Sequence, residues 1–337
     1  MKNILLVGCY GDGIHIIEVD EKEKKTTLTG TFNECENPSY LAAYGNKVYA
    51  VNEFQDKAYL TALAFADGSL RKLNQTDIPG AGACHLSVDP GGEFLYAANY
   101  ISGDLVSCAI DARGNIAGIL SHIVHEGESS HCHAVVPAPC GKRLVAVNLG
   151  TEGLYFYLTQ KGKLIPEKPH PAVKLPLGEG PRHFVFHPNG RFGYLVTEYS
   201  NKVVAFAYNQ KLGELRFICQ ESLLPDGYDK ESYAAGIVMS PDGRYLYASN
   251  RGYDHLTVFA ADAKTGLLKL QGRYPCGGAW PRDFCLSKAG DMLIVANQNS
   301  DSIVSFRADQ KTGAMGEVLD SIHISKPTCT LWLTVAD

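Results

Sequence analysis

The chain has 337 residues, of which 45% are hydrophobic and 20% are charged, a composition that is ordinary for a globular protein. The formal net charge of −5 is not concentrated in a basic block, which argues against nucleic acid as a partner. No signal peptide or membrane span is expected, because no apolar run approaches about 18 residues. The ten cysteines stand singly, without a C-x-x-C pair, which favours free thiols in a reducing compartment. We therefore expect a soluble cytoplasmic protein.

The chain begins with three apolar runs, at residues 4–9, 13–19 and 27–32, which predict β-strands. Further along, a phrase of two apolar runs joined by a Pro/Asp/Gly turn recurs roughly every fifty residues. Clear copies span residues 85–99, 183–198, 237–250 and 283–297, and weaker copies start at Pro38 and His133. Each copy predicts a β-hairpin.

A third apolar run follows the hairpins, at residues 105–110, 154–158, 203–208, 256–260 and 303–307. A fourth, more variable run comes next, for example at residues 215–220 and 268–273. No window shows a convincing amphipathic-helix period. Four antiparallel strands that repeat in this way are typical of propeller blades, whereas a β-sandwich would not repeat one hairpin phrase along the chain.

The two ends of the chain predict how the ring closes. Residues 327–333 match a first strand, and the three N-terminal runs match strands two to four. Together they make a seventh blade, which hides the edges that an open array would expose. The sequence therefore predicts an all-β fold, a seven-bladed β-propeller with four-stranded antiparallel blades, as a single domain over residues 1–337.

The hairpins also predict which side chains meet at one rim of the central channel. The first strand of a propeller blade is innermost, so its start lies beside the end of the second strand. Counting outward from each turn glycine predicts three facing pairs: Arg182 with Glu198, Arg282 with Gln298, and Arg251 with Ala235.

Comparing equivalent positions of the repeat distinguishes structural residues from candidate site residues. The position seven residues past the turn glycine is asparagine in several blades, including Asn99, Asn250 and Asn297, and it is expected to hold a loop backbone. The next position varies between blades: Glu53, Tyr100, Leu149, Glu198, Arg251 and Gln298. Such variation suits an asymmetric ligand. Three histidines share the first-strand position, although each is also compatible with a satisfied core residue: His85, His133 and His183.

Several of these runs together resemble a known family. They are residues 180–190 with Glu198, the Ser-Asn-Arg-Gly run at 249–252, and residues 281–284 with 296–301. They resemble the bacterial propeller-type 6-phosphogluconolactonase family, which also includes fungal 3-carboxy-cis,cis-muconate lactonizing enzymes. The resemblance covers essentially the whole chain. It implies a cytosolic hydrolase of carbohydrate metabolism (the pentose phosphate pathway) that converts 6-phosphogluconolactone to 6-phosphogluconate without metal or other cofactor. It also implies that four essential residues fall on His133, Arg182, Glu198 and Arg251.

The chain departs from the family pattern at two places. Asn148 and Glu152 stand where the family has Asp in an Asp-Leu-Gly-x-Asp pattern, so one carboxylate is lost and Glu152 only partly replaces the other. Gly236 stands where the family usually has Glu, and this change is expected to remove a rim carboxylate and widen the pocket.

Opening a lactone requires an activated water and a donor for the developing oxyanion. Glu198 or His133 is the candidate base, and Arg182 and Arg251 are candidates for binding the oxyanion or an anionic substituent. The alternative interpretation of Arg182 and Glu198 is a plain cross-strand salt bridge. The remaining candidates for substrate binding are His85, His183, Glu53, Arg282, Gln298 and Asn297.

Other functions compete with hydrolysis as interpretations of the sequence. His122, His125, His131 and His133 lie close in sequence, but the first two are expected on an outermost strand, so no metal site is expected. A cycloisomerase, or a lactonase for an unphosphorylated or muconate-like acid, is one alternative. A non-enzymatic propeller that binds partners is another. The expected partner is a small lactone, and the sequence does not indicate an oligomeric state.

Overall fold

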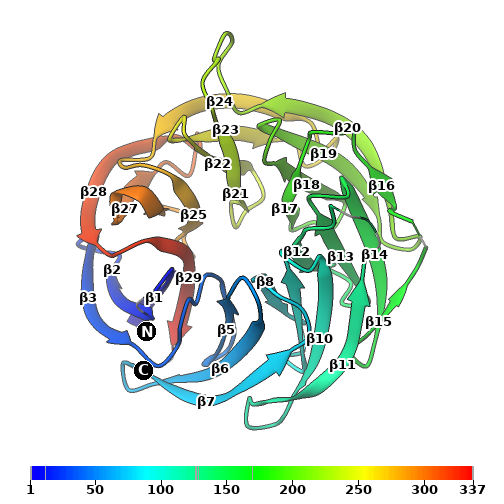
Figure 1. The fold of residues 1–337 in the computed structure, drawn as a ribbon. Coiled ribbons are helices and arrows are strands. Elements are labelled where there is room, and N and C mark those ends of the chain that lie inside the picture. Colours follow the sequence, from blue (N-terminus) through cyan, green and yellow to red (C-terminus); the bar gives the residue numbers. More distant parts are fainter. Residues whose placement is uncertain (1, 12, 126, 128, 169, 336–337) are drawn as a thin grey trace.

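A computed structural model describes residues 2–11, 13–125, 127, 129–168 and 170–335. In this part of the chain, seven antiparallel sheets stand around a central axis, and each sheet is one blade (Figure 1). The first strand of each blade is innermost and the last is outermost. The predicted all-β, seven-bladed propeller is therefore confirmed. None of the helical segments described has the length and apolar character needed to cross a bilayer.

Six blades are each built from one continuous stretch of chain. The first two contain β4 (Leu41–Tyr44), β5 (Lys47–Glu53), β6 (Ala58–Ala66) and β7 (Ser69–Ile78), then β8 (Ala83–Val88), β9 (Phe94–Asn99), β10 (Asp104–Ile110) and β11 (Ile116–Val124). The third contains β12 (Cys132–Pro137), β13 (Arg143–Asn148), β14 (Gly153–Gln160), β15 (Lys163–Pro166) and β16 (Val173–Lys174). Here the expected single outer strand is divided, since β15 and β16 pair with opposite ends of β14.

The next three blades follow in the same order. The fourth contains β17 (Pro181–Phe186), β18 (Phe192–Thr197), β19 (Lys202–Asn209) and β20 (Glu214–Ser222). The fifth contains β21 (Tyr233–Met239), β22 (Tyr245–Arg251), β23 (His255–Ala261) and β24 (Leu268–Pro275). The sixth contains β25 (Pro281–Leu286), β26 (Met292–Asn297), the 3₁₀ helix η1 (Gln298–Ser300), β27 (Ser302–Ala308) and β28 (Met315–His323).

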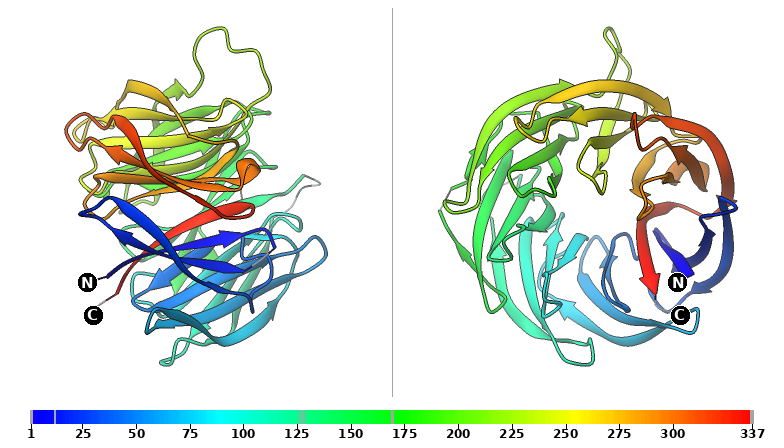
Figure 2. Two further views of the ribbon diagram at one scale, coloured as in Figure 1. Left: turned by 90° about the vertical axis from the view of Figure 1, so that its left-hand side faces the viewer. Right: turned by 180° about the vertical axis from the view of Figure 1, so that it is seen from behind.

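The seventh blade joins the two ends of the chain. Its strand order is β29 (Pro327–Val335), β1 (Lys2–Cys9), β2 (Ile14–Asp20) and β3 (Lys25–Phe32). Antiparallel pairing between β29 and β1 places Leu331 opposite Leu6, and the two termini lie side by side (Figure 2). The predicted closure by one C-terminal and three N-terminal strands is confirmed, and it removes the exposed edges that an open ring would have.

The core lies between the blades. Among the described residues, one apolar cluster fills each of the seven interfaces between neighbouring blades. A tyrosine four residues past the turn glycine is almost fully buried in several of them, for example Tyr49 and Tyr247. The Tyr49 hydroxyl donates to the Gly114 carbonyl, and the Tyr247 hydroxyl donates to the Gly313 carbonyl. These two tyrosines therefore hold the first and fifth blades to the outer turn of the blade that follows.

The first strands are irregular at the channel rim. In five blades the register between the first two strands skips residues near the start of the first strand, which is a β-bulge. The skipped residues, called here the bulge positions, are Cys84, His133, Arg182, the pair Ala235 and Gly236, and Arg282. In β21 two residues are skipped against one, Ser249, in β22, and the hairpin is centred just before Gly243, so Arg251 pairs with Tyr233 and not with Ala235 as predicted. A bulge turns side chains out of the regular alternation, here toward the channel.

Candidate active site

The bulge positions meet the ends of the second strands in a small cavity at one mouth of the channel. Its volume is about 160 Å³. Four of its described lining residues are bulge positions: Cys84, His133, Arg182 and Arg282. The other four lie eight residues past a turn glycine: Glu53, Tyr100, Glu198 and Arg251. Two equivalent positions of the repeat therefore supply the site, and the second and fourth blades contribute a side chain from both.

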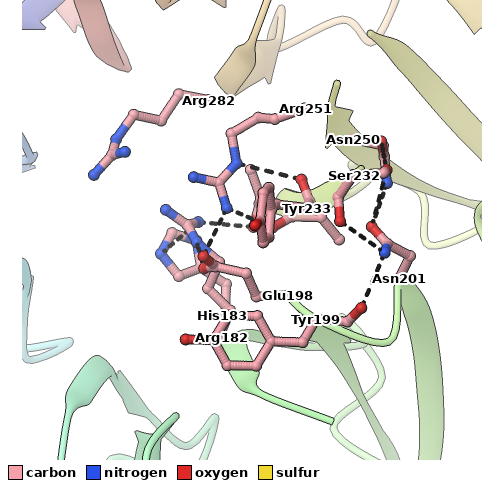
Figure 3. Close-up of polar contacts among 12 residues, drawn as sticks. Arg182, His183, Glu198, Tyr199, Asn201, Ser232, Tyr233, Asn250, Arg251 and Arg282 are labelled. Carbon is pink, nitrogen blue, oxygen red and sulfur yellow. Dashed lines mark hydrogen bonds and ion pairs between the residues drawn. The ribbon is translucent and has the colours of Figure 1, made fainter. Parts of the chain in front are cut away.

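Glu198 holds two of the three cavity arginines. Its Oε2 accepts a hydrogen bond from Arg182 Nε at 2.9 Å, and its Oε1 lies 3.0 Å from Arg251 Nη2 (Figure 3). Arg182 Nη1 also donates to the Ala235 carbonyl at 2.8 Å. The Arg182 and Arg251 side chains are only 3% and 6% exposed. The predicted proximity of Arg182 and Glu198 is thus present, as a buried network that lines the cavity.

Aromatic rings flank the second arginine of this network. The Arg251 guanidinium carbon lies 5.9 Å from the centre of the Tyr233 ring and 5.5 Å from that of Trp280. Both distances fall within the range of cation–π contacts. Burial, reinforced by the charge of Arg182, lowers the pKa of Arg251 to about 10. The guanidinium therefore stays charged at neutral pH, in a site where an added negative charge is favoured.

The third arginine makes a different set of contacts. Arg282 Nη2 donates to the Tyr10 hydroxyl at 2.7 Å. That hydroxyl in turn donates to both Glu53 oxygens, at 3.1 and 3.0 Å. Tyr10 follows β1, so the closing blade contributes to the site. Sequence reasoning missed Tyr10, although it picked out Glu53 and Arg282.

His133 is the histidine that lines the cavity. Its Nδ1 is buried, with no hydrogen-bond partner among the described residues. Burial, reinforced by Arg182 and Arg282, holds the pKa of His133 well below the ordinary value of 6.5. The imidazole is therefore neutral at neutral pH. The neighbouring Cys84 thiol also remains protonated, because burial and the charge of Glu53 raise its pKa.

The other two predicted histidines lie next to His133 but are not among the lining residues of the cavity. The ring centre of His183 is 5.1 Å from that of His133 and 5.3 Å from that of His85, which stacks on Tyr40 at 4.3 Å. His183 Nε2 lies 3.3 Å from Arg182 Nη1. His183 therefore contacts Arg182 directly, and the three histidines and Tyr40 form a packed cluster that contains the cavity residue His133 and lies next to Arg182.

Two further candidates for substrate binding lie outside the cavity lining. Asn297 is fully buried, and its amide nitrogen donates to the Cys276 carbonyl at 3.1 Å. Gln298 begins η1, and its Oε1 is buried without a hydrogen-bond partner within the described part of the chain. The equivalent Asn99 donates to the Pro79 carbonyl at 2.8 Å. The ring asparagines thus hold loop backbone, as expected for that position.

The two departures from the family pattern also lie outside the cavity lining. The buried Glu152 accepts hydrogen bonds from the Gly178 and Gly180 N–H groups, both at 2.8 Å, and so holds the loop that leads into β17. A Cβ at Gly236 would lie 3.1 Å from a ring carbon of Phe284, a core residue. The space beside Gly236 is therefore taken up by Phe284, and the widening expected there stays a prediction.

Asn148 belongs to the same class as the other ring asparagines. Its Oδ1 accepts hydrogen bonds from the His131 and Thr151 N–H groups, both at 3.0 Å. Its side chain therefore links the turn after β13 to the chain before β12. An Asp-to-Asn difference here changes a loop contact and leaves the charge of the cavity wall unaltered.

The four histidines that lie close in sequence are spread over the second blade, the third blade and the loop between them. His122 lies on the outermost strand β11, as predicted, with its Nε2 3.1 Å from Asp104 Oδ2. His131 Nδ1 bonds to the Tyr100 carbonyl at 2.8 Å. Within the described ranges, no group of three or more His, Cys, Asp or Glu side chains is arranged to hold a metal ion.

Comparisons with known proteins agree with this architecture. The family described as "Lactonase, 7-bladed beta-propeller" matches residues 4–332. A 6-phosphogluconolactonase of Bacillus subtilis strain 168 is 31% identical, over 98% of this chain and 99% of its own. A 6-phosphogluconolactonase of Formosa agariphila is 33% identical, over 84% of each chain. The solved periplasmic gluconolactonase of Pseudomonas aeruginosa is 29% identical, with a TM-score of 0.91 over 100% of both chains. The chain belongs to the lactonase family of seven-bladed β-propellers and is a lactone-hydrolysing enzyme.

Proposed function

We propose that the protein hydrolyses a phosphorylated sugar lactone, most simply 6-phosphogluconolactone, to the open-chain acid. One observation carries the proposal: the cavity places three guanidinium groups beside two carboxylates. One positive charge is therefore left for an anionic substrate. The names of the two bacterial relatives point to the same substrate. The free thiols of all ten cysteines suit a reducing compartment, and we propose the cytoplasm.

In the proposed reaction, the oxygen of a water molecule bonds to the lactone carbonyl carbon, and the bond between that carbon and the ring oxygen breaks. The water gives one proton to a base, and the base passes that proton to the departing ring oxygen, which becomes a hydroxyl group. We assign the base to His133, a neutral imidazole on the cavity wall. Both oxygens of Glu198 are already engaged by arginines, so its role is to hold them.

Arg182 and Arg251 are assigned to the oxyanion that develops on the carbonyl oxygen. Each guanidinium has five N–H donors. Within the described contacts, Nη2 of Arg182 and Nη1 of Arg251 have no protein partner, so donors remain for a substrate. Because these guanidinium groups are fixed by Glu198 and by backbone carbonyls, little reorganisation is needed as charge develops.

A second candidate substrate follows from the same charge arrangement. A lactone with a carboxylate in place of the phosphate also fits one excess positive charge, and the reverse, lactonizing direction would use the same groups. The solved neighbour that is named a gluconolactonase adds an unphosphorylated lactone to the set to be tried.

The deciding experiment measures 6-phosphogluconolactone hydrolysis by the EDTA-treated protein, against buffer and against Glu198→Ala. A rate far above buffer that collapses in the variant supports the substrate and the site together. A rate equal to buffer, combined with turnover of gluconolactone or of a carboxylated lactone, would replace the substrate while keeping the reaction class.

A further inference from the structure

Arg282 differs from the other two cavity arginines in having no carboxylate partner. Arg182 and Arg251 both pair with Glu198, whereas no carboxylate of the described residues lies within ion-pair distance of Arg282. In Figure 3 its guanidinium stands apart from the ion pairs around Glu198. It is largely enclosed, packed 5.1 Å from the centre of the Tyr10 ring. A charge removed from water in this way is unfavourable unless something compensates it.

Tyr10 stands between Arg282 and the nearest carboxylate. Its hydroxyl accepts from Arg282 and donates to both oxygens of Glu53. Burial raises the pKa of Tyr10 strongly; Arg282 opposes this effect and Glu53 reinforces it, so the group between the two charges is a neutral phenol. Without that hydroxyl, Glu53 and Arg282 would be free to form a direct ion pair, and the Arg282 donors would then be occupied by Glu53 and not available to a substrate.

We propose that Arg282 is the receptor for the anionic substituent of the substrate, a phosphate monoester, and that Tyr10 keeps Glu53 from neutralising it. This inference rests on the proposed function, since it assigns one group of that substrate to one arginine. Tyr10 is a positioning residue in this scheme, because it acts through Arg282 and Glu53. Arg282 is well suited to phosphate, because a guanidinium offers two parallel N–H donors to two phosphate oxygens.

A second pocket next to the cavity provides room for the substituent that Arg282 is proposed to bind. Tyr10 and Glu53 also line a neighbouring pocket of about 300 Å³, together with Asn37, Phe54 and Gln55. The cavity alone is smaller than the usual ligand pocket of about 300–1,000 Å³. A lactone ring bound between His133 and Glu198 would therefore direct its distal substituent toward Arg282 and this second pocket.

The first test is a binding measurement that needs no turnover. Inorganic phosphate is titrated calorimetrically into the wild type, Arg282→Gln and Arg244→Gln. Arg244 follows the turn between β21 and β22, at the opposite end of a blade, where it pairs with Asp242 at an exposed site. We expect Arg282→Gln to weaken phosphate binding at least tenfold and Arg244→Gln to leave it unchanged. Equal binding by Arg282→Gln and the wild type would overturn the assignment.

The second test is specific for the role of Tyr10. Tyr10→Phe is expected to weaken phosphate binding, because Glu53 then moves onto Arg282. Glu53→Gln is expected to tighten it, and Tyr10→Phe combined with Glu53→Gln should recover at least wild-type affinity. A structural role for the hydroxyl would leave the double variant as weak as Tyr10→Phe, and that result would refute the scheme.

Kinetics then separate this inference from the proposed function. Arg282→Gln should raise KM for 6-phosphogluconolactone at least tenfold and change KM for gluconolactone less than twofold. Equal effects on both substrates would remove the phosphate assignment while leaving lactone hydrolysis intact. If the wild type hydrolyses no phosphorylated lactone, but Arg282→Gln still abolishes phosphate binding, the proposed substrate fails and the anion receptor stands.

Discussion

Replacing Glu198 by Gln removes the one carboxylate that compensates two buried guanidinium groups. The side chains of Arg182 and Arg251 are 3% and 6% exposed, so both charges are largely withdrawn from bulk water. Breaking a buried ion pair by removing one partner costs about 3–5 kcal/mol. We expect the free energy of unfolding to fall by about 3 kcal/mol, since the Gln oxygen still accepts one hydrogen bond. Urea titration followed by tryptophan fluorescence measures this change, because Trp280 packs on Arg251.

An exposed pair provides the matched control. Arg307 and Glu317 pair at the surface with side chains 53% and 61% exposed, so Glu317→Gln should change stability by less than about 1 kcal/mol. Replacing Glu198, Arg182 and Arg251 together by Met should recover most of the lost stability, because no buried charge is left unpaired, while activity stays absent. If Glu198→Gln is no more destabilising than Glu317→Gln, the electrostatic account of the cavity is refuted.

Three further predictions concern the base, a loop and the ring closure. Burial, Arg182 and Arg282 hold the pKa of His133 below 6.5, so the imidazole stays unprotonated, and able to act as a base, well into the acid range. The acid limb of the kcat/KM profile should therefore lie below pH 6.5. A limb at or above that pH would contradict the role of His133 as base. Glu152→Ala removes the hydrogen bonds that hold the loop at residues 178–180. Arg182 would then be misplaced, and kcat should fall by about tenfold or more. An unchanged kcat would show that other contacts hold the loop. Deleting residues 327–335 removes β29 and exposes an edge of β1, so light scattering should detect association of the variant. A monomeric variant that unfolds at the same urea concentration as the wild type would show that pairing of β29 with β1 does not stabilise the ring.

The repeat makes much of the site predictable from the amino-acid sequence. A hairpin of constant length places a fixed position of its second strand at the rim, so counting from the turn glycine locates Glu53, Glu198 and Arg251. The same count places Arg182 beside Glu198, which the ion pair at 2.9 Å bears out. These inferences succeed because the hairpins have nearly the same length, so their second strands end at the same rim of the channel.

The parts that sequence reasoning missed have two physical causes. The bulges leave no trace in the apolar pattern, so counting from the turn could not give the partner of Arg251 correctly, and Cys84 was not recognised as a rim residue. Tyr10 was missed because its blade is assembled from both ends of the chain, and the clear hairpin phrase is absent there. A comparison of repeats cannot locate Tyr10, because the repeat that contains it is divided between two distant segments of the chain.

The bulges also explain how a nearly symmetric ring carries an asymmetric charge pattern. In a regular strand the side chain at each position faces the same way in every blade, and seven similar blades would then present similar walls. A skipped residue has no cross-strand partner, so its side chain is released from the packing that fixes its neighbours. Such a position can change from Cys84 to His133 to Arg182 without disturbing the interfaces between blades. The scaffold and the chemistry are therefore set by different residues of the same strand, which allows related propellers to keep the ring and change the substrate.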